Sequence, residues 1–97
     1  MKVLIADDEI KVCNLVQQLI DWEGLGLELT AVVHDSESAL AAIFAHNPEI
    51  VITDIRMPKK GGIEMIREVR EKRLDTHFII ISGYPEFEYA SRAIKYG

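Results

Sequence analysis

Short apolar runs alternate with longer amphipathic stretches throughout this chain of 97 residues. Two of the runs are Val3-Leu4-Ile5-Ala6 and Ile50-Val51-Ile52-Thr53. Parallel strands that are buried on both faces have this composition, and the helices that connect them are amphipathic. Right-handed crossovers place such helices on both sides of the sheet. The alternation therefore predicts an α/β fold, a doubly wound parallel sheet in one small domain covering residues 1–97.

The expected elements can be placed from these runs and from residues that start and stop helices. Strands are expected at residues 2–6, 27–33, 49–53 and 78–81, and helices at 10–22, 36–46, 63–73 and from about 85 onward. Gly24 and Gly26 are expected to end the first helix. Asp35 is a suitable N-cap for the second helix, and Pro85 suits the first turn of the last one.

Apolar residues at helical spacing predict which side of each helix faces the sheet. On the first helix they are Val12, Cys13, Val16, Leu19 and Ile20; on the second, Ala39, Leu40, Ile43 and Phe44; on the third, Ile63, Ile66 and Val69. The opposite side of the third helix carries a run of charged residues that is expected in solvent. Cys13, the only cysteine, is therefore expected in the core, and no internal disulfide can form.

The composition excludes several classes of protein. The hydrophobic fraction of 48% and the charged fraction of 28% argue against disorder. The net charge of −5 disfavours direct binding of nucleic acid by this segment, because nucleic-acid-binding domains present clustered lysine and arginine. The sequence has no apolar span that suits a membrane and no signal-peptide pattern. These observations favour a cytoplasmic protein without membrane contact.

Three aspartates follow the apolar runs. Asp7 and Asp8 come directly after Ala6, and Asp54 comes directly after Thr53. Ligands of open α/β sheets bind outside the carboxyl ends of the strands, where these carboxylates should meet. Three carboxylates repel one another unless a cation shares the site, and oxygen ligands suit hard divalent cations. The pattern therefore predicts a Mg²⁺ site.

Asp54 is also a candidate nucleophile. A carboxylate at the end of a buried strand can attack a phosphoryl group to form an acyl-phosphate, while Asp7 and Asp8 hold the metal that neutralises charge. Ser82 ends the fourth run at the same edge and could donate a hydrogen bond to an anion. Any single aspartate after a strand commonly caps only a turn or a helix, but this explanation weakens when three occur together.

Other polar and aromatic residues have less specific assignments. Glu9 is expected to place its charge near the N-terminus of the first helix, which is a structural role. His34, His46 and His77 share no spacing, and they are expected at the surface or hydrogen-bonded in the core rather than as metal ligands. Phe87 is expected in the core, whereas the tyrosines at positions 84, 89 and 96 could belong to a partner surface or simply pack.

Taken together, three segments resemble the receiver domain of bacterial two-component response regulators. They are Asp7-Asp8-Glu9, Asp54-Ile55-Arg56-Met57-Pro58 with Gly62, and Ser82-Gly83-Tyr84. The resemblance covers the whole chain and implies a flavodoxin-like (CheY-like) sheet of strand order 2-1-3-4-5. It also implies transfer of a phosphoryl group from the phosphohistidine of a sensor histidine kinase to an aspartate of the receiver. Such a receiver catalyses its own phosphorylation and dephosphorylation and is not a conventional enzyme.

The resemblance further implies roles for individual residues. Asp54 would be the phospho-acceptor, Asp8 a direct Mg²⁺ ligand and Asp7 a ligand that acts directly or through water. The backbone carbonyl of Arg56 would complete the protein's share of the metal ligands. Ser82 would be the switch hydroxyl that turns onto the phosphoryl group and changes the surface that partners contact.

Residues 82–90 resemble receivers that precede an AraC-type helix-turn-helix output domain. This finer resemblance implies a transcription regulator whose own C-terminal domain binds DNA, and a homodimer partner is a further expectation. In the family a fifth strand carries a lysine that binds the phosphoryl group, and a fifth helix follows. Lys95 stands too early for that role. We therefore expect this receiver to be incomplete at its C-terminal end.

Two other functions stay open at the level of sequence. A receiver-like interaction module that works without phosphorylation would keep the fold; the missing final elements favour it and the intact acids oppose it. An aspartate-nucleophile phosphatase would also place acids and Mg²⁺ at strand ends, but it separates nucleophile and acid by two residues, whereas Asp7 and Asp8 are adjacent. Nucleotide binding has least support, because no glycine-rich phosphate loop follows the first strand.

Overall fold

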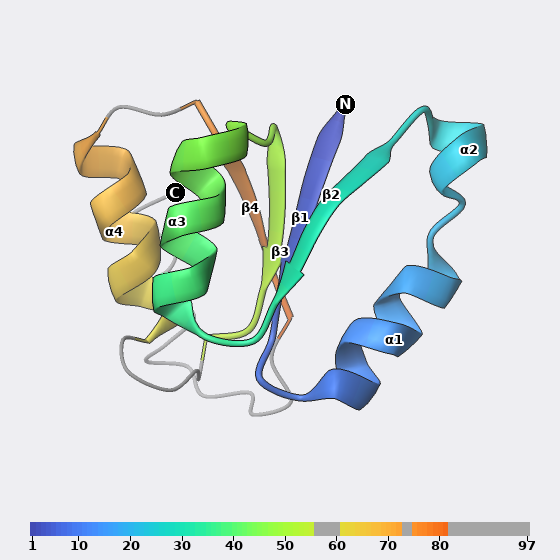
Figure 1. The fold of residues 1–97 in the computed structure, drawn as a ribbon, viewed down its shortest axis with the longest axis horizontal. Coiled ribbons are helices and arrows are strands. Elements are labelled where there is room, and N and C mark those ends of the chain that lie inside the picture. Colours follow the sequence, from blue (N-terminus) through green and yellow to red (C-terminus); the bar gives the residue numbers. More distant parts are fainter. Residues whose placement is uncertain (56–60, 73–74, 82–97) are drawn as a thin grey trace.

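The computed structural model describes residues 1–55, 61–72 and 75–81, and its elements alternate as the sequence predicts (Figure 1). In chain order they are β1 (Lys2–Ala6), α1 (Ile10–Leu19), α2 (Trp22–Leu25), β2 (Glu28–Val33), α3 (Ser36–His46), β3 (Ile50–Thr53), α4 (Gly62–Glu71) and β4 (His77–Ile80). The strand boundaries differ from the expected ones by no more than one residue. The helix expected from about Pro85, with its aromatic residues, lies outside the described residues.

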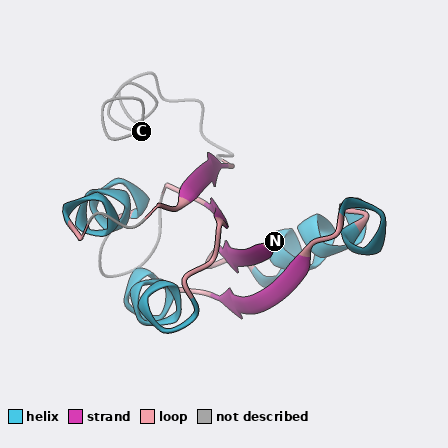
Figure 2. Ribbon diagram, turned by 90° about the horizontal axis from the view of Figure 1, so that it is seen from above, coloured by secondary structure: helices cyan, strands magenta, loops and turns pink. Residues whose placement is uncertain are grey.

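The described strands form one parallel sheet in the order β2-β1-β3-β4. Helices α3 and α4 cover one face of this sheet, and α1 lies on the other side with α2 (Figures 1 and 2). The predicted doubly wound α/β fold and the strand order 2-1-3-4 are therefore confirmed. Because all strands run in one direction, their carboxyl ends share one edge, and this edge is where the candidate site lies.

The core has two layers because successive side chains of a strand point to opposite faces. Leu4 and Ala6 of β1 pack with buried residues of α3 and α4, whereas Val3 and Ile5 pack with buried residues of α1. Burial of each of the valine, leucine and isoleucine side chains contributes about 1.5–3 kcal/mol. Cys13 belongs to the α1 layer and is only 1% exposed, so its predicted place in the core is confirmed.

The first helix is shorter than predicted. It was expected to continue to Trp22, but α1 ends at Leu19 and Ile20 is extended. Asp21 then starts α2 by accepting a hydrogen bond from Gly24 N–H, so Gly24 lies inside α2 instead of ending α1. The Trp22 indole donates to the Gln17 carbonyl (2.9 Å), one of the carbonyl groups that the end of a helix leaves without an intrahelical partner. The Asp21 cap and the Trp22 hydrogen bond across the break therefore accompany two helices in place of the single long helix that was expected.

The helix termini also depend on residues with special backbone conformations. Gly26 ends α2 in the left-handed region (φ 67°), as Asn47 does for α3 (φ 51°). Asp35 caps α3 as predicted, because its carboxylate accepts from Ser38 N–H (2.7 Å). Glu9 occupies the N-cap position of α1, but its side chain makes no capping hydrogen bond.

Three helix side chains are not exposed or buried as the sequence predicts. Leu19 is 74% exposed and Phe44 is 44% exposed, so the apolar stripes of α1 and α3 are narrower than the sequence suggests. On α4 the predicted inward residues are buried, but Arg70 is not fully in solvent. Its guanidinium lies 5.3 Å from the centre of the Phe78 ring.

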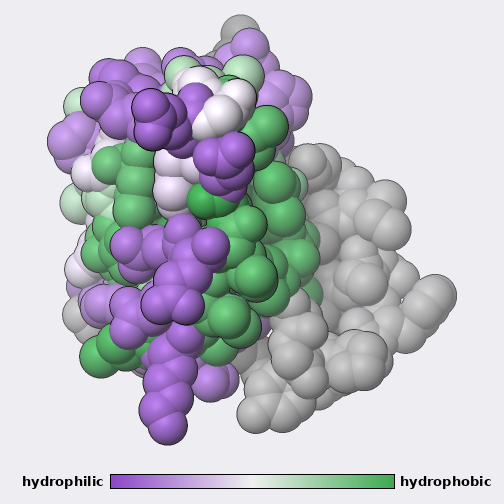
Figure 3. All heavy atoms as spheres, turned by 90° about the vertical axis from the view of Figure 1, so that its right-hand side faces the viewer, coloured by the Kyte–Doolittle hydropathy of each residue, from purple (hydrophilic) through white to green (hydrophobic). Residues whose placement is uncertain are grey.

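The face of the sheet beside α1 retains exposed hydrophobic side chains. Ile79 of β4 pairs with Ile52 and therefore lies on the α1 face, where half of its side chain is exposed. Figure 3, which views the molecule from the side of α1 and α2, shows hydrophobic residues gathered over a broad area. In the described part of the chain, no helix is both long enough and apolar enough to span a membrane.

Candidate functional site

The parallel register of β1 and β3 brings Asp7 and Asp54 side by side. Ala6 is the register partner of Thr53, and the next residue of each strand is an aspartate. Asp54 N–H donates to the Ala6 carbonyl (3.1 Å), and Asp7 N–H donates to the Val33 carbonyl of β2 (3.0 Å). The hydrogen-bonded ladder thus extends one residue past the strands. Both acids therefore directly follow β1 and β3, the two inner strands of the described sheet.

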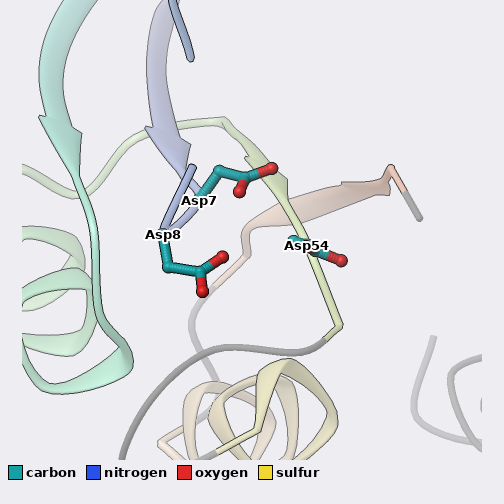
Figure 4. A group of neighbouring side chains, drawn as sticks. All are labelled: Asp7, Asp8 and Asp54. Atoms are coloured by element: carbon teal, nitrogen blue, oxygen red, sulfur yellow. The ribbon is translucent and has the colours of Figure 1, made fainter. Parts of the chain in front are cut away.

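Three carboxylates meet at this edge of the sheet. One oxygen from each of Asp7, Asp8 and Asp54 lies within 4.8 Å of the others, and Figure 4 shows the three side chains gathered at the ends of β1 and β3. Asp7 and Asp54 are only 5% and 7% exposed, whereas Asp8 is exposed. The sequence predicted that these residues would come together, and the structure does bring them together.

Local hydrogen bonds fix the orientation of the two buried carboxylates. Glu9 N–H donates to Oδ1 of Asp7 (2.9 Å), and Ile55 N–H donates to Oδ1 of Asp54 (2.7 Å). The Thr53 hydroxyl donates to the Asp54 carbonyl (2.9 Å), which holds the backbone of the same residue. The acids are therefore held in place before any ligand arrives, as a metal or phosphoryl site requires.

Burial makes the Asp7 carboxylate difficult to ionise. The pKa of Asp7 is raised from 3.8 to about 6, chiefly by desolvation and to a smaller extent by the nearby charges of Asp54, Asp8 and Glu9. The hydrogen bond from Glu9 N–H acts in the opposite direction. A cation at this position would relieve both the repulsion and the desolvation. The donors are all hard carboxylate oxygens, which fit Mg²⁺.

The first turn of α4 closes on the backbone of Asp54. Gly62 N–H donates to the Ile55 carbonyl (2.6 Å). A Cβ atom at Gly62 would stand far inside contact distance of the Asp54 carbonyl oxygen and 3.0 Å from the Ile55 Cα. At Gly61 the nearest atom would be 3.5 Å away, an ordinary contact. Of this glycine pair, only Gly62 is required for the close approach.

Two residues that the sequence assigned no part in the site contact the backbone of Asp7. His34 Nδ1 lies 2.9 Å from the Asp7 carbonyl oxygen, and Cys13 Sγ lies 3.5 Å from the same oxygen. His34 is exposed, which agrees with the surface position, one of the two positions expected for the histidines. Its position immediately after β2 was the available signal, because that position lies at the same edge of the sheet as the acids.

The remaining predicted site residues cannot be placed by this structure. Arg56, whose carbonyl was expected to bind the metal, lies outside the described residues. The predicted switch hydroxyl of Ser82 and the neighbouring Tyr84 also lie outside them. The geometry above therefore concerns Asp7, Asp8 and Asp54 alone.

A parallel sheet of order 2-1-3-4 with an acidic cluster at its carboxyl edge defines a class of signalling domains, and the comparisons agree. Residues 3–97 match the model of the response regulator receiver domain. The chain belongs to this family.

A relative of known sequence agrees with this assignment. The transcriptional regulatory protein YesN of Bacillus subtilis is 41% identical over 96 residues, and the match covers 99% of this chain and 26% of YesN. The chain thus spans about a quarter of the length of that relative.

Solved structures show the same fold. The receiver domain of the response regulator AraT from Geobacillus stearothermophilus has a TM-score of 0.91 and 38% identity, covering 99% of this chain and 74% of that one. A CheX–CheY complex from Borrelia burgdorferi, described as containing BeF3 and Mg, has a TM-score of 0.87 and 26% identity, covering 100% of this chain and 72% of that one.

Proposed function

We propose that this receiver accepts a phosphoryl group on Asp54 from the phosphohistidine of a sensor histidine kinase. The observation that carries the proposal is the buried Asp54 carboxylate, held by Ile55 N–H and lying within 4.8 Å of carboxylate oxygens of Asp7 and Asp8. A carboxylate that served only to cap a turn would not need two further acids beside it.

The chemistry follows from this arrangement. An Asp54 carboxylate oxygen attacks the phosphorus, a new P–O bond forms, and the P–N bond of the phosphohistidine breaks. The imidazole leaves with the electron pair and is protonated. Asp7 and Asp8 would hold Mg²⁺, which supplies positive charge against the phosphoryl oxygens. The protein's own contribution is to orient Asp54 and to keep the acids fixed around it.

The remaining steps of the signal rest on the family resemblance. The Arg56 carbonyl would complete the metal ligands, and Ser82 would turn onto the phosphoryl group and alter a partner surface. In the full-length cytoplasmic protein that surface controls a C-terminal DNA-binding output domain, by itself or through a homodimer. The transcriptional regulator YesN supports this output. Because Asp54 is itself modified, the domain acts as a phospho-acceptor and not as a conventional enzyme.

The test is the intact mass of the full-length protein after incubation with acetyl phosphate and Mg²⁺. The mass is expected to rise by one phosphoryl group, and the gain should be lost in Asp54→Ala. Asp75→Ala, which removes an exposed aspartate outside the cluster, should keep it. No mass gain in the wild type, or an unchanged gain in Asp54→Ala, would contradict the proposal. Turnover of a generic phosphate ester would instead indicate a phosphatase.

A further inference from the structure

The carbonyl oxygen of Asp7 has side-chain neighbours from two other parts of the fold. His34 Nδ1, in the loop after β2, lies 2.9 Å away, and Cys13 Sγ, in α1, lies 3.5 Å away. These two atoms are 3.8 Å from each other. We call Cys13, His34 and the Asp7 carbonyl the Asp7 clamp. It links α1 and the β2–α3 loop to the end of β1.

The acceptor at the centre of the clamp determines the chemistry of His34. A carbonyl oxygen can only accept hydrogen bonds, so Nδ1 of His34 must carry the proton. The thiol of Cys13 is a weak second donor to the same oxygen. In a neutral imidazole this leaves Nε2 without a proton, and the tautomer of His34 is therefore a directly measurable consequence of the contact.

The clamp acts on the peptide that joins two of the three acids. The Asp7 carbonyl and the Asp8 N–H belong to one planar peptide unit. A contact that fixes the carbonyl oxygen therefore also fixes the orientation of the backbone at Asp8. The other groups of Asp7 are already held, because its N–H donates to Val33 and its carboxylate accepts from Glu9 N–H. The carbonyl contact is therefore the one that sets the orientation of the Asp7–Asp8 peptide.

We infer that His34 is a positioning residue which, supported by Cys13, holds the Asp7–Asp8 peptide so that both carboxylates face Asp54. This inference rests on the proposed Mg²⁺ function. A reactive role for the Cys13–His34 pair does not fit the same geometry, since Cys13 is 1% exposed and burial raises the pKa of its thiol. The pair therefore supports the acids and is not a second site.

The first test measures Mg²⁺ affinity of the full-length protein in four forms. His34→Ala removes the donor and should weaken Mg²⁺ binding by about three- to tenfold. The effect should be smaller than that of removing a hydrogen-bond partner of a ligand side chain, because His34 contacts the backbone of Asp7. His34→Asn places an amide N–H at the position of Nδ1 and should stay within about twofold of the wild type. His46→Ala, the matched control, removes an exposed histidine of α3 and should change nothing.

A second measurement needs no metal. In metal-free wild-type protein labelled with ¹⁵N-histidine, neutral His34 should be the Nδ1–H tautomer, with its signals assigned by their loss in His34→Ala. An Nε2–H tautomer, or unchanged Mg²⁺ affinity in His34→Ala, would overturn the inference. Equal weakening in His34→Ala and His34→Asn would also overturn it, because it would show that the ring acts only by packing. Failure of the wild type to bind Mg²⁺ would instead contradict the proposed function, and the tautomer would then decide whether the clamp exists.

Discussion

Among the aspartates in the described part of the chain, Asp7 is the most deeply buried. It is 5% exposed, and its pKa is raised to about 6 chiefly by desolvation. One carboxylate oxygen of each of Asp8 and Asp54 lies within 4.8 Å of a carboxylate oxygen of Asp7. At neutral pH the metal-free fold therefore holds a buried negative charge beside two others, which is unfavourable for stability and favourable for binding a cation.

This predicts an unusual pH dependence for the metal-free protein. The folded state holds the Asp7 proton more tightly than the unfolded chain does between about pH 4 and pH 6, so the Asp7 contribution to the free energy of unfolding falls as pH rises through that window. Asp7→Asn removes the charge and retains an oxygen that can accept from Glu9 N–H. It should be more stable than the wild type at pH 7 by about 1–2 kcal/mol.

Urea unfolding at several pH values, with chelator present, measures both effects. Asp75→Asn, which neutralises an exposed aspartate, serves as the control and should follow the wild type. The same pH dependence in Asp7→Asn as in the wild type would show that another group is responsible.

At the scale of elements, the site depends on how closely α4 approaches β3. The first residue of α4, Gly62, donates to the Ile55 carbonyl and leaves no room for a Cβ atom beside the Asp54 carbonyl. A helix that begins so close to the strand end holds the Asp54 backbone between itself and β1. The glycine is therefore part of what makes Asp54 rigid.

Gly62→Ala should consequently destabilise the protein by about 1–3 kcal/mol, because the methyl group pushes against backbone atoms that cannot move independently. Gly61→Ala is the matched control. Its added methyl group meets only an ordinary contact of 3.5 Å, and its effect should stay within about 0.5 kcal/mol. Denaturant midpoints of the two variants measure the difference, and equal midpoints would show that the close approach is not needed.

At the scale of the molecule, metal binding and folding should be coupled. The acids come from the ends of β1 and β3, so a cation that binds all three links strands which unfolding separates. Mg²⁺ should then raise the free energy of unfolding by about 1.4 kcal/mol when its free concentration is ten times the Kd. Trp22, in α2 near the opposite end of the sheet (Figure 1), reports unfolding at a distance from the site.

Thermal unfolding followed by Trp22 fluorescence, with and without Mg²⁺, measures this coupling. The rise in Tm should be largely lost in Asp8→Asn and kept in Asp75→Asn. An equal rise in Asp8→Asn would mean that Mg²⁺ stabilises the protein from another site.

The sequence by itself determined the positions of the described strands, most of the described helices and the meeting of Asp7, Asp8 and Asp54, whereas the strand order was expected from the family resemblance. The element positions and the acidic cluster follow from local patterns, since apolar runs define strands and the carboxyl ends of parallel strands must share an edge. Even so, the break after Leu19 was missed, because it depends on the Asp21 cap and on the Trp22 indole bonding back to α1.

Only the tertiary structure decided how the acids are held. The contact of His34 with Asp7 joins residues 27 positions apart, and the approach of Gly62 to Asp54 depends on how α4 packs. The exposure of Leu19 and Phe44 is likewise a property of the packed structure. Local patterns do not specify such contacts, because the contacts arise from the packing of elements. The position of His34 directly after β2 indicates only that it lies at the same edge of the sheet as the acids.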